Sequence, residues 1–187
     1  QARIICTTPR LRGLIVVRAH MEDISSLTAY QMLFRRAMAE QEVSKLIGQL
    51  VFAYSKLVNN LHVCVAWHND GRDIDRYGEI AEDLAAAELI KMIERQAETR
   101  FGKDSEQYRR YRYWTIRAHK VREQRNIIMH ARWNIEPYGR HAIATSTPIF
   151  VEPPNTIVYS TGALADICSD CDHLAQELMQ LKNKYPL

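Results

Sequence analysis

Hydrophobic residues recur at intervals of three and four along most of this chain, a spacing that places them on one face of an α-helix. The longest such pattern runs from Glu40 to about His68. It consists of Val43, Leu46, Ile47, Leu50, Val51, Tyr54, Leu57, Val58, Leu61, Cys64 and Val65. A helix of this length measures about 45 Å, and the turn-forming sequence at residues 69–71, Asn-Asp-Gly, predicts its end.

Four other segments carry the same helical spacing. They are residues 27–39, 79–99, 105–132 and 161–185. The predicted N-caps are Ser25 or Ser26, Asp104 or Ser105, and Thr161. Gly102 is expected to close the second of these segments, and Pro186 lies just beyond the last.

Residues 133–160 differ from the helical segments. They contain four prolines, Gly139 and two short runs that favour β-structure, residues 141–145 and 156–159. We therefore predict an all-α fold, an up-down bundle of four or five helices with a small β-hairpin excursion before the last helix. Residues 21–187 form one domain in this prediction, and residues 133–160 are its β and loop excursion.

The first 20 residues do not fit the helical pattern. They hold four arginines and no acidic residue. Met21, in contrast, begins a sequence that resembles the natural start of a protein and leads into a helix cap. We interpret residues 1–20 as an N-terminal appendage of added or upstream sequence. A basic transit peptide and a folded edge strand at residues 13–18 are the alternatives.

Composition is ordinary for one globular domain: 47% of the 187 residues are hydrophobic and 25% are charged. Apolar runs such as residues 14–17 are far shorter than the roughly 20 residues that span a bilayer, so no membrane association is expected. The four cysteines suggest no disulfide framework, which favours a reducing, cytoplasmic compartment. Cys168 and Cys171 have C-x-x-C spacing with His173 nearby, but a single pair is weak support for a metal site.

Positive charge is concentrated in one predicted helix. Residues 108–132 hold eight lysines and arginines against one acid, Glu123, although the net charge of the chain is only +3. Such a local field favours a polyanionic partner. The run at residues 108–114 interleaves tyrosine, tryptophan and arginine, so it could contact RNA directly. Alternatively, these residues lie on two faces of the helix, with Tyr111 and Trp114 in the core and the arginines in solvent.

The end of this helix carries the residues that suggest chemistry. Arg125 presents a positive fork suited to phosphate, and His130 carries an imidazole, a side chain that can take or give a proton. P-loops, dinucleotide-binding glycine patterns and Ser/His/Asp triads are absent from the sequence. The pair therefore indicates transfer at a phosphodiester without a cofactor.

Residues 125–130, with Asn126 directly after the arginine, resemble the Arg-x4-6-His motif of the HEPN family. The order of helices, Trp133 and a closing helix resembles that family as well. The resemblance implies a homodimeric, metal-independent endoribonuclease of the toxin or defence kind, for which an antitoxin protein is a possible partner. The implied catalytic residues are Arg125, Asn126 and His130, and the candidate substrate-binding residues are Arg122, His119, Arg117 and Arg132. Non-catalytic family members, which act as protein- or nucleic-acid-binding homodimers, are the main alternative.

The spacing of the motif raises a geometric problem. On an ideal helix Arg125 and His130 lie about 140° apart, whereas Arg122, Asn126 and His130 share a face. A distorted helix end, long side chains that converge in a cleft, or two copies that face each other would each reconcile the pair. A purely structural role for the two residues is the alternative. Arg125 would then pair with a carboxylate such as Glu123, and a positively charged His130 would interact favourably with the dipole at the C-terminus of the helix. A third class of function is a helical regulator that binds a small ligand.

Overall fold

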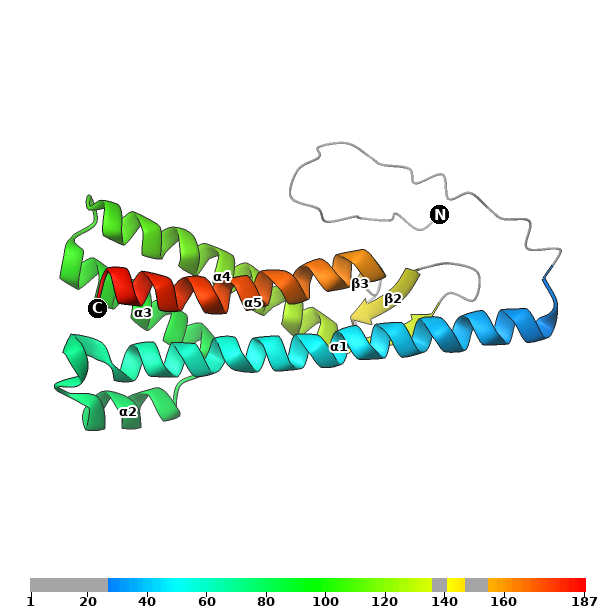
Figure 1. The fold of residues 1–187 in the computed structure, drawn as a ribbon, viewed down its shortest axis with the longest axis horizontal. Coiled ribbons are helices and arrows are strands. Elements are labelled where there is room, and N and C mark those ends of the chain that lie inside the picture. The colour runs from blue at the N-terminus through cyan, green and yellow to red at the C-terminus, as the bar shows by residue number, and fades with distance from the viewer. Residues whose placement is uncertain (1–26, 136–140, 147–154) are drawn as a thin grey trace. The chain divides into compact units, whose positions relative to one another are not determined.

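The computed structural model describes residues 27–135, 141–146 and 155–187, which form five α-helices, a short 3-10 turn and three strands (Figure 1). The elements are α1 (Ala29–Ala66), η2 (His68–Gly71), α2 (Ile74–Glu82), α3 (Ala86–Phe101), α4 (Glu106–His130), β1 (Ala131–Ile135), β2 (His141–Ser146), β3 (Asn155–Ser160) and α5 (Thr161–Lys184). The predicted helical bundle with a β excursion before the last helix is therefore confirmed. None of the described helices combines the length and apolar character that a bilayer crossing requires.

The chain divides into two compact units, and each is described separately. The first unit comprises residues 1–47 and 127–165, and the second comprises residues 48–126 and 166–187. Helices α1, α4 and α5 each contribute residues to both units. The boundary within α4 falls between Asn126 and Ile127, inside the motif identified from the sequence.

Helix α1 is one continuous helix of 38 residues, whereas the sequence predicted two. No glycine or proline lies near the expected junction at residues 39–40, so nothing interrupts the backbone hydrogen bonds. The N-terminus is held by a reciprocal pair: the Gln31 N–H donates to Thr28 Oγ1 at 3.2 Å, and the Thr28 N–H donates to Gln31 Oε1 at 2.9 Å. The predicted caps Ser25 and Ser26, like residues 1–20, lie outside the described residues.

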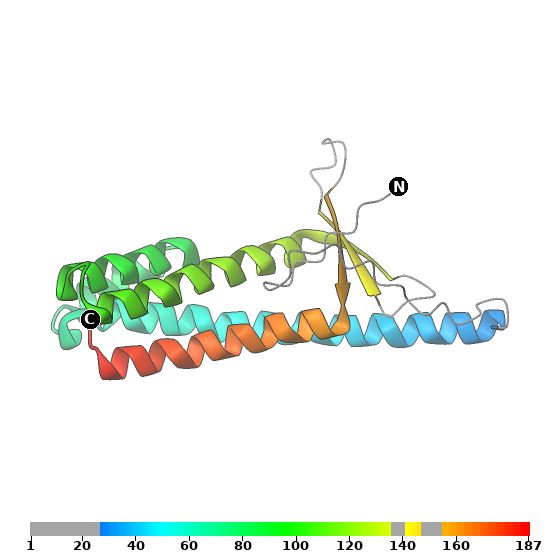
Figure 2. The ribbon, with the colours of Figure 1, turned by 90° about the horizontal axis from the view of Figure 1, so that it is seen from above.

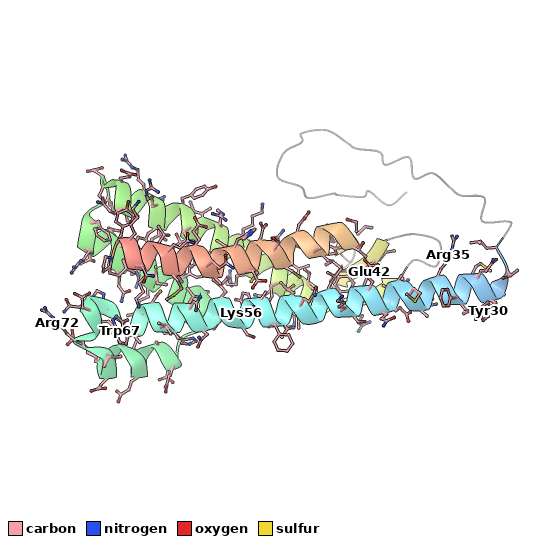
Figure 3. The ribbon with its side chains drawn as sticks, in the orientation of Figure 1. Tyr30, Arg35, Glu42, Lys56, Trp67 and Arg72 are labelled. Carbon is pink, nitrogen blue, oxygen red and sulfur yellow. The ribbon has the colours of Figure 1, made fainter. Side chains whose placement is uncertain are left out.

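The first turns of α1, in the first unit, expose their apolar stripe. Tyr30, Leu33, Phe34 and Met38 are 77%, 68%, 57% and 51% exposed, and Figure 3 shows Tyr30 near the start of the helix. The apolar spacing therefore predicted the helix but not the burial of this face. A contiguous stripe of large exposed apolar side chains marks an interaction surface.

The excursion of the first unit is a three-stranded antiparallel sheet in the order β1-β2-β3 (Figure 2). Strand β1 follows α4 without a gap, so the helix ends at His130 instead of the predicted Arg132. Trp133 accounts for this early end. Its Nε1 donates to the Ile128 carbonyl at 3.1 Å, and its ring lies 5.8 Å from that of Tyr159 on β3. Ser160, not Thr161, caps α5 by accepting the Ala163 N–H at 3.0 Å.

In the second unit, the segment predicted as one helix over residues 79–99 is two helices. Helix α2 ends at Glu82 and α3 begins at Ala86. Glu88 stabilises the new helix start, because its Oε2 accepts the Ala85 N–H at 3.2 Å. Gly102, with a φ of 77°, closes α3 as predicted, and Ser105 caps α4 by accepting the Tyr108 N–H at 3.1 Å.

The core of the second unit lies among α1, α3, α4 and α5, which run side by side in Figures 1 and 2. Trp114 is fully buried, and its Nε1 donates to the Leu174 carbonyl at 3.0 Å. Asn60 donates to the Ala175 carbonyl at 2.9 Å, which joins α1 to α5. The other buried apolar residues include Leu50, Leu57, Leu61, Val65, Leu89, Ile90, Ile93, Tyr111, Ala118, Val121 and Leu178.

Candidate functional site

Arg125 occupies the inward face of α4. The residues that precede it on that face, Trp114, Ala118 and Val121, are buried, and Arg125 itself is half-buried. Its guanidinium carbon lies 4.9 Å from the centre of the Tyr54 ring, on α1 of the same unit. A cation over an aromatic face is stabilised by the ring quadrupole, although by much less than a carboxylate partner would provide.

No carboxylate pairs with Arg125 among the described residues. Its Nη1 donates to the side-chain carbonyl oxygen of Asn126 at 3.2 Å, and its Nε is buried without a hydrogen-bond partner. Glu123, the acid considered as its partner, lies 3.5 Å from Arg122 instead. A half-buried guanidinium without a counter-ion is costly, so this arrangement favours a site for an anion.

Arg122 lies one turn before Arg125 and has similar surroundings. Its side chain is 26% exposed, its Nε is buried without a partner, and its pair with the exposed Glu123 is long. Burial raises the pKa of the Tyr54 hydroxyl, while the positive charges of Arg125 and Arg122 act in the opposite direction. The charges of both arginines therefore reach the half-buried hydroxyl of Tyr54. This part of the second unit is locally positive.

His119 lies one turn before Arg122 on α4. Partial burial lowers its pKa, and the positive charges of Arg122 and Lys91 add to this effect, while Glu123 and Glu94 oppose it. A lowered pKa keeps the imidazole neutral at neutral pH, the form that accepts a proton. A neutral His119 has one ring nitrogen that accepts and one that donates a hydrogen bond.

We expect the protein to lose stability in mild acid. The pKa of His68 is also lowered, by burial first and then by Arg100, with Asp73 opposing. Because both folded-state pKa values lie below the ordinary 6.5, the unfolded chain binds more protons between those values. The unfolding temperature should therefore fall as pH decreases through about 6.5. The double variant His68→Gln/His119→Gln should show a smaller fall, and an unchanged pH dependence would contradict this origin.

The other predicted site residues differ in how freely their side chains could contact a substrate. Arg117 donates to Glu177 Oε2 at 2.7 Å, an ion pair between α4 and α5 that a phosphate would have to displace. His130, the last residue of α4, and Arg132, on β1, are both exposed. Asn126 is half-buried beside Arg125. Helix α4 remains helical through His130, so the distorted helix end that we considered is not observed.

The aromatic and basic run at the start of α4 is divided by face, as one of the two interpretations predicted. Tyr108, Tyr111 and Trp114 are buried, whereas Arg109 and Arg112 are exposed. Cys171 of the C-x-x-C pair is buried, and this burial raises the pKa of its thiol to about 12. Among the described residues no group of three His, Cys, Asp or Glu side chains is placed to hold a metal ion.

Tyr54 is the site residue that sequence reasoning missed. Its position in the apolar stripe of α1 identified it only as a core residue. Arg125 and Tyr54 lie more than 70 residues apart in the sequence, so their contact cannot be recognised from a local sequence pattern.

Comparison with family models, with curated proteins and with solved structures finds no match.

Proposed function

We propose that this protein is a metal-independent endoribonuclease of the HEPN kind. The ribose 2′-hydroxyl attacks the adjacent phosphorus and the bond to the 5′-oxygen breaks. His130 transfers the proton as general base or acid, and Arg125 stabilises the negative charge that develops on the phosphoryl oxygens. Asn126 orients the arginine. The products are a 2′,3′-cyclic phosphate and a 5′-hydroxyl, and DNA resists because it lacks the attacking group.

The half-buried guanidinium of Arg125, which has no carboxylate partner in the part of the chain that the structure describes, is the observation that carries this proposal. The desolvation cost of an arginine grows as it is buried, and a paired acid commonly offsets part of that cost. Arg125 is held by an aromatic face and an amide oxygen, both of which leave its charge available to an incoming phosphate. His130 is exposed and so is accessible to a macromolecular substrate.

The proposed enzyme acts as a homodimer, as the HEPN resemblance implies, and RNA is its substrate. A toxin or defence role, with an antitoxin as partner, follows from the same resemblance. The direct test is incubation of the purified protein with structured and single-stranded RNA in excess chelator. We expect cleavage by the native protein and none by the double variant Arg125→Ala/His130→Ala. Equal cleavage by both would identify a contaminating nuclease and refute the proposal.

The second candidate is a non-catalytic homodimer that serves as a binding scaffold. The exposed stripe of Tyr30, Leu33, Phe34 and Met38 fits the homodimer that both candidates require. The occupant to which we commit is a second copy of the chain. Replacing Leu33 and Phe34 together by glutamate should convert a dimer to a monomer, because buried unpaired charge opposes association. Light scattering after size-exclusion chromatography measures this. A dimer that survives the change would place the interface elsewhere.

A further inference from the structure

The guanidinium of Arg125 is held by two neighbours in the second unit. Its carbon lies over the ring of Tyr54, on α1, at 4.9 Å from the ring centre. Its Nη1 donates to the side-chain oxygen of Asn126, the next residue on α4, at 3.2 Å. A free arginine side chain samples many rotamers. One contact with a second helix and one along its own helix restrict that freedom.

These two contacts leave part of the guanidinium available to a ligand. The Nη2 of Arg125 makes no hydrogen bond or ion pair within the ranges that the structure describes. In contrast to the Nε of the same side chain, Nη2 is not buried. It is therefore the nitrogen that an incoming phosphate oxygen can reach.

Tyr54 is a firm and uncharged support for this cation. It is half-buried, and the residues before and after it in the apolar stripe of α1, Leu50 and Leu57, are buried. Burial raises the pKa of its hydroxyl above the ordinary value, against the opposing charges of Arg125 and Arg122. The phenol is therefore neutral at neutral pH, and it holds the guanidinium without cancelling its charge. A carboxylate in the same place would neutralise the arginine.

We propose that Tyr54 is a positioning residue of the ribonuclease site, whose ring holds Arg125 so that Nη2 contacts a phosphoryl oxygen in the transition state. This inference rests on the proposed function, and it adds a residue of α1 to a motif that lies on α4. A guanidinium placed before the substrate binds does not have to reorganise during the reaction, so it stabilises the developing charge more strongly. The role belongs to the ring and not to the hydroxyl, because the ring makes the contact.

Two substitutions separate the ring from the hydroxyl. Tyr54→Phe keeps the ring and should cleave RNA within about twofold of the native rate. Tyr54→Leu removes the ring and should lower the rate constant at saturating RNA by about 10- to 100-fold, because small displacements of a catalytic group cause losses of this order. KM should change by less than about threefold, since the charge of Arg125 acts mainly in the transition state. Cleavage rates over a range of RNA concentrations give both values.

Coupling to Arg125 distinguishes positioning from a purely structural role. In the Arg125→Ala background, Tyr54→Leu should cause no further loss of rate, because the ring then has no guanidinium to hold. A tyrosine that only supported the fold would lower the rate by the same factor in both backgrounds. Phe52→Leu removes an aromatic ring that is 74% exposed on α1, and as the matched control it should cleave at the native rate.

The native chain is the reference for every variant. Tyr54→Met, whose flexible apolar side chain adapts to irregular space, replaces the leucine variant if that chain does not fold. Absence of cleavage by the native chain would overturn the proposed function, and the role of Tyr54 with it. Native cleavage together with a fully active Tyr54→Leu, an impaired Tyr54→Phe, or equal losses in the two Arg125 backgrounds would overturn the role of the Tyr54 ring alone.

Discussion

Replacing Arg125 by alanine should reduce RNA cleavage by about 10²- to 10³-fold, the usual effect of removing a group that stabilises transition-state charge. His130→Ala should reduce it by about 10²- to 10⁴-fold, because the proton then has no positioned acceptor or donor. Arg125→Lys should remain impaired, since an ammonium cannot reproduce the flat, two-pronged contact with phosphate. Cleavage rates on one labelled RNA, measured under single-turnover conditions, give these ratios directly.

Two matched controls separate catalysis from folding. Arg72→Ala and His173→Ala remove an exposed arginine and an exposed histidine outside the motif and should cleave at the native rate. The unfolding temperature of Arg125→Ala should fall only slightly, because the variant loses the contacts with the Tyr54 ring and with Asn126 but, among the described residues, no carboxylate pair. Native activity in Arg125→Ala, or a loss of activity that merely follows a loss of structure, would refute the catalytic role of this arginine.

Trp114→Ala should lower the free energy of unfolding by about 3–5 kcal/mol, the range observed for emptying a large buried aromatic site. Trp114 is fully buried in the second unit, and its indole N–H donates to the Leu174 carbonyl on α5 at 3.0 Å. The variant removes packing and leaves that carbonyl without its side-chain donor. Urea denaturation followed by circular dichroism measures the change.

Trp114→Phe is the matched control for this effect, because it keeps an aromatic ring and removes the hydrogen bond. It should cost clearly less than the alanine variant. Tyr113→Ala removes an aromatic side chain that is 62% exposed next to Trp114 in the sequence, and it should have little effect. Equal stability losses for Trp114→Ala and Tyr113→Ala would contradict the assignment of Trp114 to the core.

Local sequence signals predicted most of the fold. The apolar spacing identified the helical segments, and Gly102 and Ser105 mark the turn between α3 and α4 where expected. The errors lie where weak local preferences compete. The break before Ala86 depends on a glutamate that bonds the backbone three residues earlier, and the end of α4 depends on Trp133, which contacts Ile128 and Tyr159. Neither interaction can be inferred from the spacing of apolar residues.

The candidate site was predictable only in part. Arg125, Asn126 and His130 were identifiable because their side-chain chemistry and spacing form a motif in the sequence. The contact between Arg125 and Tyr54 depends on how α1 and α4 pack together. Glu123 pairs with Arg122 and not with Arg125 because of the side-chain rotamers on α4.

If the motif at the end of α4 cleaves RNA as proposed, the attacking group is the 2′-hydroxyl of the RNA. The most direct measurement is to incubate the native protein, in excess chelator, with an RNA and with the same sequence as 2′-O-methyl RNA, and to determine the product ends by mass spectrometry. We expect that only the unmodified RNA is cut and that the products carry 2′,3′-cyclic phosphate and 5′-hydroxyl ends. Cleavage of the methylated strand, or 5′-phosphate ends, would contradict it.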